Sequence, residues 1–137
     1  MRGHWRDGGA TLDIGPAAEA AGAEAAAGAA AGAAVVVPVE VAASYAARTR
    51  GLLGRDGIEG AMLLTPAASV HTFRMRFAID VAYLDRRLRV VALTTMPPGR
   101  LGLPRPRARH VLEAEAGAMA AWGLRVGSVL RLRLDRR

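Results

Sequence analysis

Four polar side chains in the middle and late parts of the chain could do chemistry: Arg55, His71, Asp80 and Glu113. If the two carboxyls shared one cleft, they would form an acid/base pair of the kind that hydrolases use. The imidazole could act as a general base only with a nucleophile within reach, and no serine lies in a Gly-x-Ser-x-Gly segment. A third alternative is one divalent ion held by His71, Asp80 and Glu113.

Each of these side chains also has a structural interpretation. A carboxylate such as Asp80, next to an apolar segment, is stable when an arginine or backbone N–H groups pair with it, and Arg55 or Arg50 is the expected partner. A histidine among apolar residues is most often a core residue with its hydrogen bonds satisfied. We therefore assign no catalytic residue, no cofactor and no metal. The candidate ligand-binding or structural cluster consists of Arg50, Arg55, His71, Met75, Asp80 and Glu113.

The segment that carries His71 alternates between apolar and basic residues. Across Val70–Phe77 one face holds His71, Phe73, Met75 and Phe77, and the other holds Thr72, Arg74 and Arg76. Alternation with a period of two predicts a strand that turns the imidazole inward and the arginines toward water.

Other segments predict short strands as well. Val35–Val41 alternates, and Pro38 within it indicates an edge strand. Ser44 is a suitable N-cap for a short helix. Further strands are expected at Ala61–Leu64, at Ile79–Leu84 and Leu88–Leu93 as a hairpin, at His110–Ala114 and at Val129–Leu134, with an exposed loop over Met96–Arg109. The expected fold is mainly β, at the margin of α+β: an antiparallel β-sandwich or open barrel with one or two short helices.

The 137 residues are expected to form one domain after a variable start. Residues 1–34 are interpreted as a variable N-terminal segment whose Ala/Gly-rich part is a linker, and residues 35–137 as a single β-rich domain. A small hairpin with Ala10–Ile14 as its second arm is expected near the N-terminus. The Ala25–Val37 run is too short and too weakly apolar for a membrane span or a signal peptide. Cytoplasm is the default location, and export stays open.

Composition limits the possible partners. The net charge is +7, all 19 basic residues are arginine, and lysine and cysteine are absent. Disulfides and thiolate metal sites are thereby excluded. The uniform use of arginine indicates GC-rich codons, and we expect a bacterial source. Few aromatic residues are present, so nucleic acid is an unlikely partner. The Arg100–Arg109 loop could hold a phosphate or an acidic partner, or could simply be solvated.

Four blocks in order resemble a known family. They are Arg50–Arg55, Gly60–Leu64, His71–Val81, and Val111–Glu113 followed by Gly117. The chain resembles domain of unknown function 192, also known as the uncharacterised protein family UPF0127. The match runs from Val39 to about Leu132. Two positions depart from the family pattern, since Ala78 replaces a common proline and Ser128 a frequent aspartate.

The resemblance implies a compact β-rich fold and leaves the biochemical function unknown. It also implies that many relatives are exported or membrane-anchored, and that some in high-GC bacteria are encoded near pilus-assembly and secretion genes. We therefore predict a small non-enzymatic binding or accessory domain for a small polar ligand or a partner segment, with an envelope or secretion role as a further expectation. The alternative is a small hydrolase-like enzyme that uses Asp80, Glu113 and His71. The sequence predicts no oligomeric state.

Overall fold

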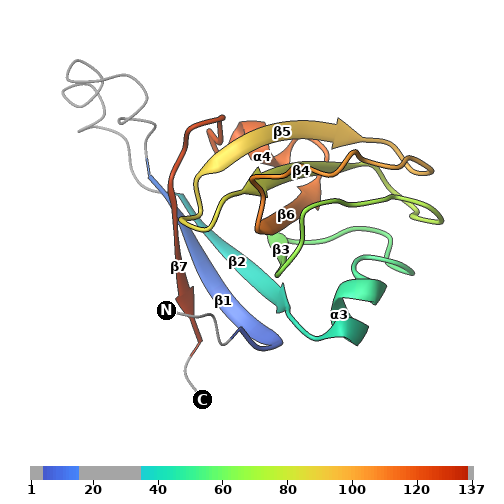
Figure 1. Cartoon of the computed structure of the whole chain (residues 1–137), viewed down its shortest axis with the longest axis horizontal. Helices are drawn as coiled ribbons and strands as arrows, with labels where there is room; N and C mark the ends of the chain where they lie inside the picture. The colour runs from blue at the N-terminus through green and yellow to red at the C-terminus, as the bar shows by residue number, and fades with distance from the viewer. Residues whose placement is uncertain (1–4, 16–34, 136–137) are drawn as a thin grey trace.

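The computed structural model describes residues 5–15 and 35–135, so the predicted Ala/Gly-rich linker lies outside the described residues. Within them, seven strands and two short helices follow one another along the chain (Figure 1). The elements are β1 (Gly8–Ile14), β2 (Val35–Ala42), α3 (Tyr45–Arg50), β3 (Ala61–Leu64), β4 (Ile79–Leu84), β5 (Val90–Met96), β6 (His110–Glu115), α4 (Ala118–Ala121) and β7 (Leu130–Leu134). The prediction of a mainly β fold with one or two short helices is confirmed.

All seven strands belong to one sheet in the order β5-β4-β6-β3-β2-β1-β7, which is not closed into a barrel. Neighbouring strands are antiparallel except for β2 and β3. β2 and β3 run parallel because the connection that contains α3 returns the chain to the end of the sheet where β2 began. The sheet is therefore mixed, which corrects the purely antiparallel expectation.

Apolar side chains cover both faces of the central strands. On one face, Ala82 and Leu112 join residues of β1, β2 and β7 and the α4 residue Met119 in a single cluster. On the other face, Val81 and Val111 pack with residues of the helix and loops that follow β2 and β3. The strands β3, β4 and β6 are thus buried on both sides, and a polar group on them needs a partner or a cavity.

Two expectations for the first strands are wrong. The segment around Ala10–Ile14 forms no local hairpin in the described residues; it is β1, paired with β2 on one side and β7 on the other. Pro38 does not mark an edge either, because β2 lies between β1 and β3. The pairing with β3 starts only at Val39, so the proline sits just outside that ladder and removes none of its hydrogen bonds.

The predicted strand Val70–Phe77 is also wrong. This segment is an irregular loop. Among the described residues its one bridge joins His71 to Leu101, and Arg74 has a positive φ of 65°. Val70, Thr72 and Met75 are buried, whereas His71 and Phe73 are exposed. The polar Thr72 can be buried because its hydroxyl donates to the Pro97 carbonyl at 2.6 Å and accepts from the Arg100 amide at 2.8 Å.

Several local predictions are confirmed. The Ser44 hydroxyl accepts a hydrogen bond from the Ala47 amide at 3.1 Å and caps α3. The turn between β4 and β5 is held by Asp85, whose carboxylate accepts from the amides of Arg87 and Arg89. The segment between β5 and β6 is a long exposed loop, as its prolines require.

Candidate functional site

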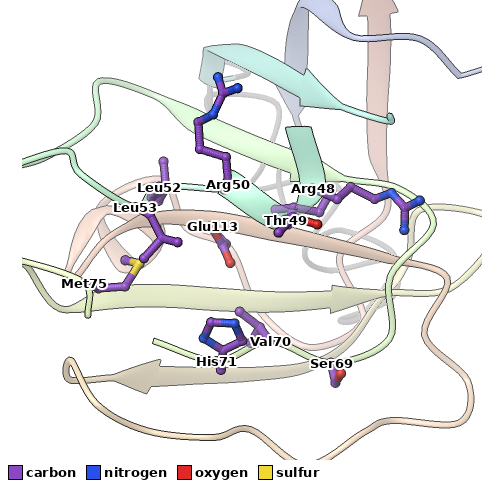
Figure 2. A pocket seen from close by; sticks show the side chains of 12 residues that line it. Arg48, Thr49, Arg50, Leu52, Leu53, Ser69, Val70, His71, Met75 and Glu113 are labelled. Carbon is purple, nitrogen blue, oxygen red and sulfur yellow. The ribbon is translucent and has the colours of Figure 1, made fainter. Parts of the chain in front are cut away.

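A hollow of about 100 Å³ opens between α3, the loop after β3, and β6 (Figure 2). We call it the Glu113 hollow, after the carboxyl at its floor. Its lining comes from Arg48, Thr49, Arg50, Gly51, Leu52, Leu53, Leu64, Ser69, Val70, His71, Met75 and Glu113. A space of this size can hold several water molecules or the end of one side chain.

Glu113 is held at the floor by the central strand β6. It lies opposite Met62 of β3 and Val81 of β4, so an apolar side chain flanks it on each side. Only 3% of the residue is exposed, and no hydrogen bond or ion pair reaches its carboxyl from the residues that the structure describes. Burial alone raises the pKa of Glu113 to about 7, because the charged form loses its hydration and gains no compensating partner.

The walls around this carboxyl combine apolar and polar side chains. Figure 2 shows the Glu113 carboxyl directed into the space bounded by Leu53, Met75, Val70 and His71. The buried Met75 arrives on the irregular loop after β3. The exposed His71 ring stacks on Phe73 with centroids 5.0 Å apart. The hollow therefore presents one buried acid with apolar side chains beside it and polar side chains elsewhere in its lining.

The nearby arginines do not neutralise this acid. The Arg48 guanidinium donates to the backbone carbonyls of Ala43 and Pro66, at 3.3 and 3.2 Å. The Arg50 side chain is exposed, and in Figure 2 both guanidinium groups point away from Glu113. Glu113 is consequently without an internal counter-cation among the described residues.

Asp80 projects from the opposite face of the sheet. It lies on β4 opposite Ala114, one position from the Val81–Glu113 pair, and successive strand residues point to opposite faces. Its carboxylate accepts hydrogen bonds from the Thr95 hydroxyl at 2.7 Å and from the amides of Gly117 and Met119 at 2.9 and 3.1 Å. The expected Asp80–Glu113 acid/base pair does not form, and neither does a metal set of His71, Asp80 and Glu113.

Asp80 instead closes the N-terminal end of α4. Gly117, the N-cap residue of α4, offers no side-chain hydrogen bond, so the carboxylate from β4 takes that role from outside the helix. Backbone amides therefore satisfy Asp80, and its expected pairing with Arg55 or Arg50 is wrong.

Arg55 pairs with Glu40 of β2. Its guanidinium donates two hydrogen bonds to that carboxylate, at 2.6 and 2.8 Å. These hydrogen bonds are the main reason that the pKa of Glu40 lies below its usual value. They also raise the pKa of Arg55 above its usual value. The pair borders a separate hollow of about 370 Å³ that Arg50 also lines. Of the six candidate residues, the structure brings His71, Met75, Glu113 and Arg50 to one hollow, and it places Arg55 and Asp80 elsewhere.

The sequence alone did not single out Leu53, Val70 or Ser69 as lining residues. Ser69 and His71 share the hollow, yet no hydrogen bond joins them in the described part of the chain, and the His71 Nδ1 accepts from the Phe73 amide at 3.3 Å. Residues 5–15 and 35–135 also contain no group of three potential metal ligands close enough to share an ion. Neither described helix is long and apolar enough to cross a membrane.

Comparison with known proteins gives the family. Residues 27–132 match the family described as uncharacterized ACR, domain of unknown function 192. The chain belongs to this family. The resemblance drawn from the four sequence blocks is thus confirmed.

Relatives with similar sequences are proteins of unknown function. A UPF0127 protein of Pyrococcus horikoshii is 36% identical over 84 residues, which is 58% of this chain and 73% of the relative. Another from Pyrococcus furiosus is 32% identical over 99 residues, 69% of this chain and 85% of the relative. Both organisms are archaea, so these relatives do not support the expected bacterial source.

Solved structures share the fold at low sequence identity. A Sinorhizobium meliloti protein, whose proposed role is that of a transcription regulator, superposes with a TM-score of 0.72 at 16% identity, covering 94% of this chain and 97% of that one. A Novosphingobium aromaticivorans protein of unknown function gives a TM-score of 0.69 at 18% identity, covering 88% of this chain and 83% of that one. At these identities the likeness establishes the fold alone.

Proposed function

We propose that this chain is a small binding domain that receives a ligand group in the Glu113 hollow. The observation that carries the proposal is the carboxyl of Glu113, a residue only 3% exposed, which is directed into an open hollow and has no hydrogen-bond partner among the described residues (Figure 2). No fully buried side-chain oxygen lacks a hydrogen bond in the described part of the chain, so the Glu113 carboxyl remains reachable from the hollow. A ligand that supplied N–H donors there would stabilise the charged carboxylate, which burial disfavours.

The chemistry of the hollow favours a ligand with an N–H donor on a short apolar body. The carboxyl accepts hydrogen bonds when ionised, and Leu53, Met75 and Val70 offer apolar contacts around it. An ammonium group adds charge attraction to Glu113, because neither Arg48 nor Arg50, which also line the hollow, pairs with this carboxyl in the described structure (Figure 2). Such a ligand would stabilise the ionised form and lower the pKa of Glu113 from about 7, so its binding should strengthen as the pH rises.

The test compares three probes of equal length: n-butylamine, butyramide and butyrate. Amide chemical shifts of the full chain are followed by NMR at pH 6 and pH 8, with Glu113→Gln beside it and the exposed Glu59→Gln as the matched control. We expect butylamine to shift resonances of residues around the hollow, more at pH 8 than at pH 6, in the wild type and in Glu59→Gln. Absence of shifts with all three probes, or equal shifts in Glu113→Gln, would contradict the proposal.

The pKa of Glu113 also favours a second candidate, proton transfer. A carboxyl that titrates near neutral pH can accept and return a proton during a reaction, and a substrate could reach it through the hollow. This replaces the three-residue hydrolase alternative, which required Asp80 on the same face. A turnover that follows the titration of Glu113 and disappears in Glu113→Gln would support it. The envelope or secretion role implied by the resemblance stays a prediction.

A further inference from the structure

Two loops that lie far apart in the sequence form one projecting unit. We call residues 70–78 and 97–109 the paired loops. The Thr72 amide donates to the Arg100 carbonyl at 2.7 Å, the Gly99 amide to the Thr72 carbonyl at 2.7 Å, and the Gly102 amide to the Val70 carbonyl at 2.8 Å. Figure 1 shows them side by side at the end of the sheet away from β1, β2 and β7.

The paired loops expose three large apolar side chains. Leu101 is 69% exposed, Leu103 is 73% exposed, and Phe73 is 45% exposed. Leu101 is bridged to His71, which stacks on Phe73, so Leu101 and Phe73 belong to one surface, and Leu103 follows Leu101 by two residues in the same loop. Exposed leucines at loop positions gain nothing from the fold and are suited to an apolar environment outside the protein.

The same loops are strongly basic. They contain six arginines and no acidic residue. Arg76 pairs with the exposed Asp56 at 3.2 Å, and Arg105 lies 5.0 Å from the ring centre of Tyr83. Within residues 5–15 and 35–135, no ion pair forms with Arg74, Arg100 or Arg107, all of which are exposed. The surface thus combines uncompensated positive charge with protruding apolar groups.

We infer that the paired loops dock onto the surface of an anionic lipid membrane. Leu101, Leu103 and Phe73 would enter the boundary between headgroups and acyl chains, while the arginines would face the lipid phosphates. Nucleic acid fits this surface less well, because exposed leucines gain nothing from a phosphate backbone. The inference goes beyond the Glu113 hollow and does not depend on a ligand there.

Sedimentation of the full chain with vesicles tests the inference. One vesicle preparation is phosphatidylcholine alone, and the other contains equal parts of phosphatidylcholine and phosphatidylglycerol, at about 0.15 M salt. We expect binding to the anionic vesicles only, with partitioning reduced about tenfold or more in Leu101→Ser/Leu103→Ser and in Arg100→Gln/Arg107→Gln. Free glycerol phosphate in excess should not displace the protein, because it offers no apolar layer.

Matched controls use the same substitutions elsewhere on the surface. Leu134→Ser removes an exposed leucine from β7, and Arg86→Gln/Arg87→Gln removes two exposed arginines from the β4–β5 turn. Both controls should bind the anionic vesicles as the wild type does, and all variants should keep the wild-type melting temperature. The inference is overturned if the wild type does not bind anionic vesicles, if Leu101→Ser/Leu103→Ser binds them as the wild type does, or if added RNA displaces the protein from the vesicles.

Discussion

The carboxyls of Asp80 and Glu113 lie on hydrogen-bonded neighbouring strands and leave the sheet from opposite faces. Their positions differ by one step in the register, since Asp80 faces Ala114 and Glu113 faces Val81. Asp80 accepts hydrogen bonds from three donors on its side, whereas Glu113 faces the hollow on the other side and has no hydrogen-bond partner among the described residues. One step in register thus separates Asp80, which holds the fold through three hydrogen bonds, from Glu113, whose pKa is raised toward neutral pH. Substitution of Asp80 should lower stability, and substitution of Glu113 should change how stability depends on pH.

Glu113→Gln should change how stability depends on pH. The pKa of Glu113 is about 7 in the folded protein against an unperturbed value of 4.5, so the folded state binds more protons than the unfolded state between these values. The free energy of unfolding should therefore fall as the pH rises through this window, by about 3 kcal/mol in total. Urea unfolding at pH 5 and pH 8 measures most of this loss, about 2–3 kcal/mol, which Glu113→Gln should not show.

Glu59→Gln is the control for that measurement, because its exposed side chain should leave the pH profile unchanged. Burial lowers the pKa of His110, so protonation of the unfolded state should weaken stability as the pH falls below about 6.5, the opposite sign to Glu113. The difference between the wild-type and Glu113→Gln profiles isolates the Glu113 contribution. If the free energies of unfolding of the wild type and Glu113→Gln differed by the same amount at pH 5 and at pH 8, the prediction would be contradicted.

Asp80→Asn should destabilise the fold and loosen α4 in particular. Asparagine keeps one acceptor oxygen, whereas Asp80 uses two to serve the Thr95 hydroxyl and two backbone amides. Loss of charge-assisted acceptors should cost about 2–3 kcal/mol in urea unfolding. The Met119 amide should also exchange faster with solvent. Asp56→Asn, whose side chain is 87% exposed, should change stability by less than about 0.5 kcal/mol. An unchanged Asp80→Asn would refute the capping role.

Thr72→Val should weaken the connection between the paired loops. It removes the hydroxyl that serves the Pro97 carbonyl and the Arg100 amide and leaves both groups without that partner. The expected loss is about 1–3 kcal/mol, because valine preserves the volume of the buried side chain. Thr72→Ser keeps the hydroxyl and should recover most of this loss. Thr94→Val, at a half-buried position on β5, is the control. Equal stability of Thr72→Val and Thr72→Ser would argue against the hydroxyl contacts.

Local patterns predicted much of the fold. Ala61–Leu64, the hairpin around Asp85 and the Ser44 cap follow from neighbouring residues, and the structure confirms them. The loop at residues 70–78 could not be predicted in this way. Its backbone partners lie in residues 97–102, and only that contact makes Thr72 a better buried residue than His71.

The candidate site was predictable in part for a similar reason. Residue type and order singled out His71, Met75 and Glu113, which do share a hollow. Residue types alone could not indicate which backbone amides would bind Asp80, because every residue type except proline carries such an amide, and those of Gly117 and Met119 do so only in the folded chain. The residue types also could not indicate that the Arg48 guanidinium would turn away from Glu113. It does so because it donates to the backbone carbonyls of Ala43 and Pro66, which are brought near only by folding.

The Arg55–Glu40 pair should contribute little to stability despite its bidentate geometry. Its side chains are 37% and 51% exposed, so water and salt screen the attraction. A double-mutant cycle with Arg55→Gln and Glu40→Gln should give a coupling energy below about 1 kcal/mol. The coupling should shrink further as the salt concentration rises, because screening strengthens. The exposed Arg133–Asp13 pair, with one hydrogen bond at 3.0 Å, provides a weaker reference cycle. A coupling energy above about 2 kcal/mol that does not change with salt concentration would contradict this prediction. It would mean that this pair, rather than the apolar layers, holds α3 and its following loop to the sheet.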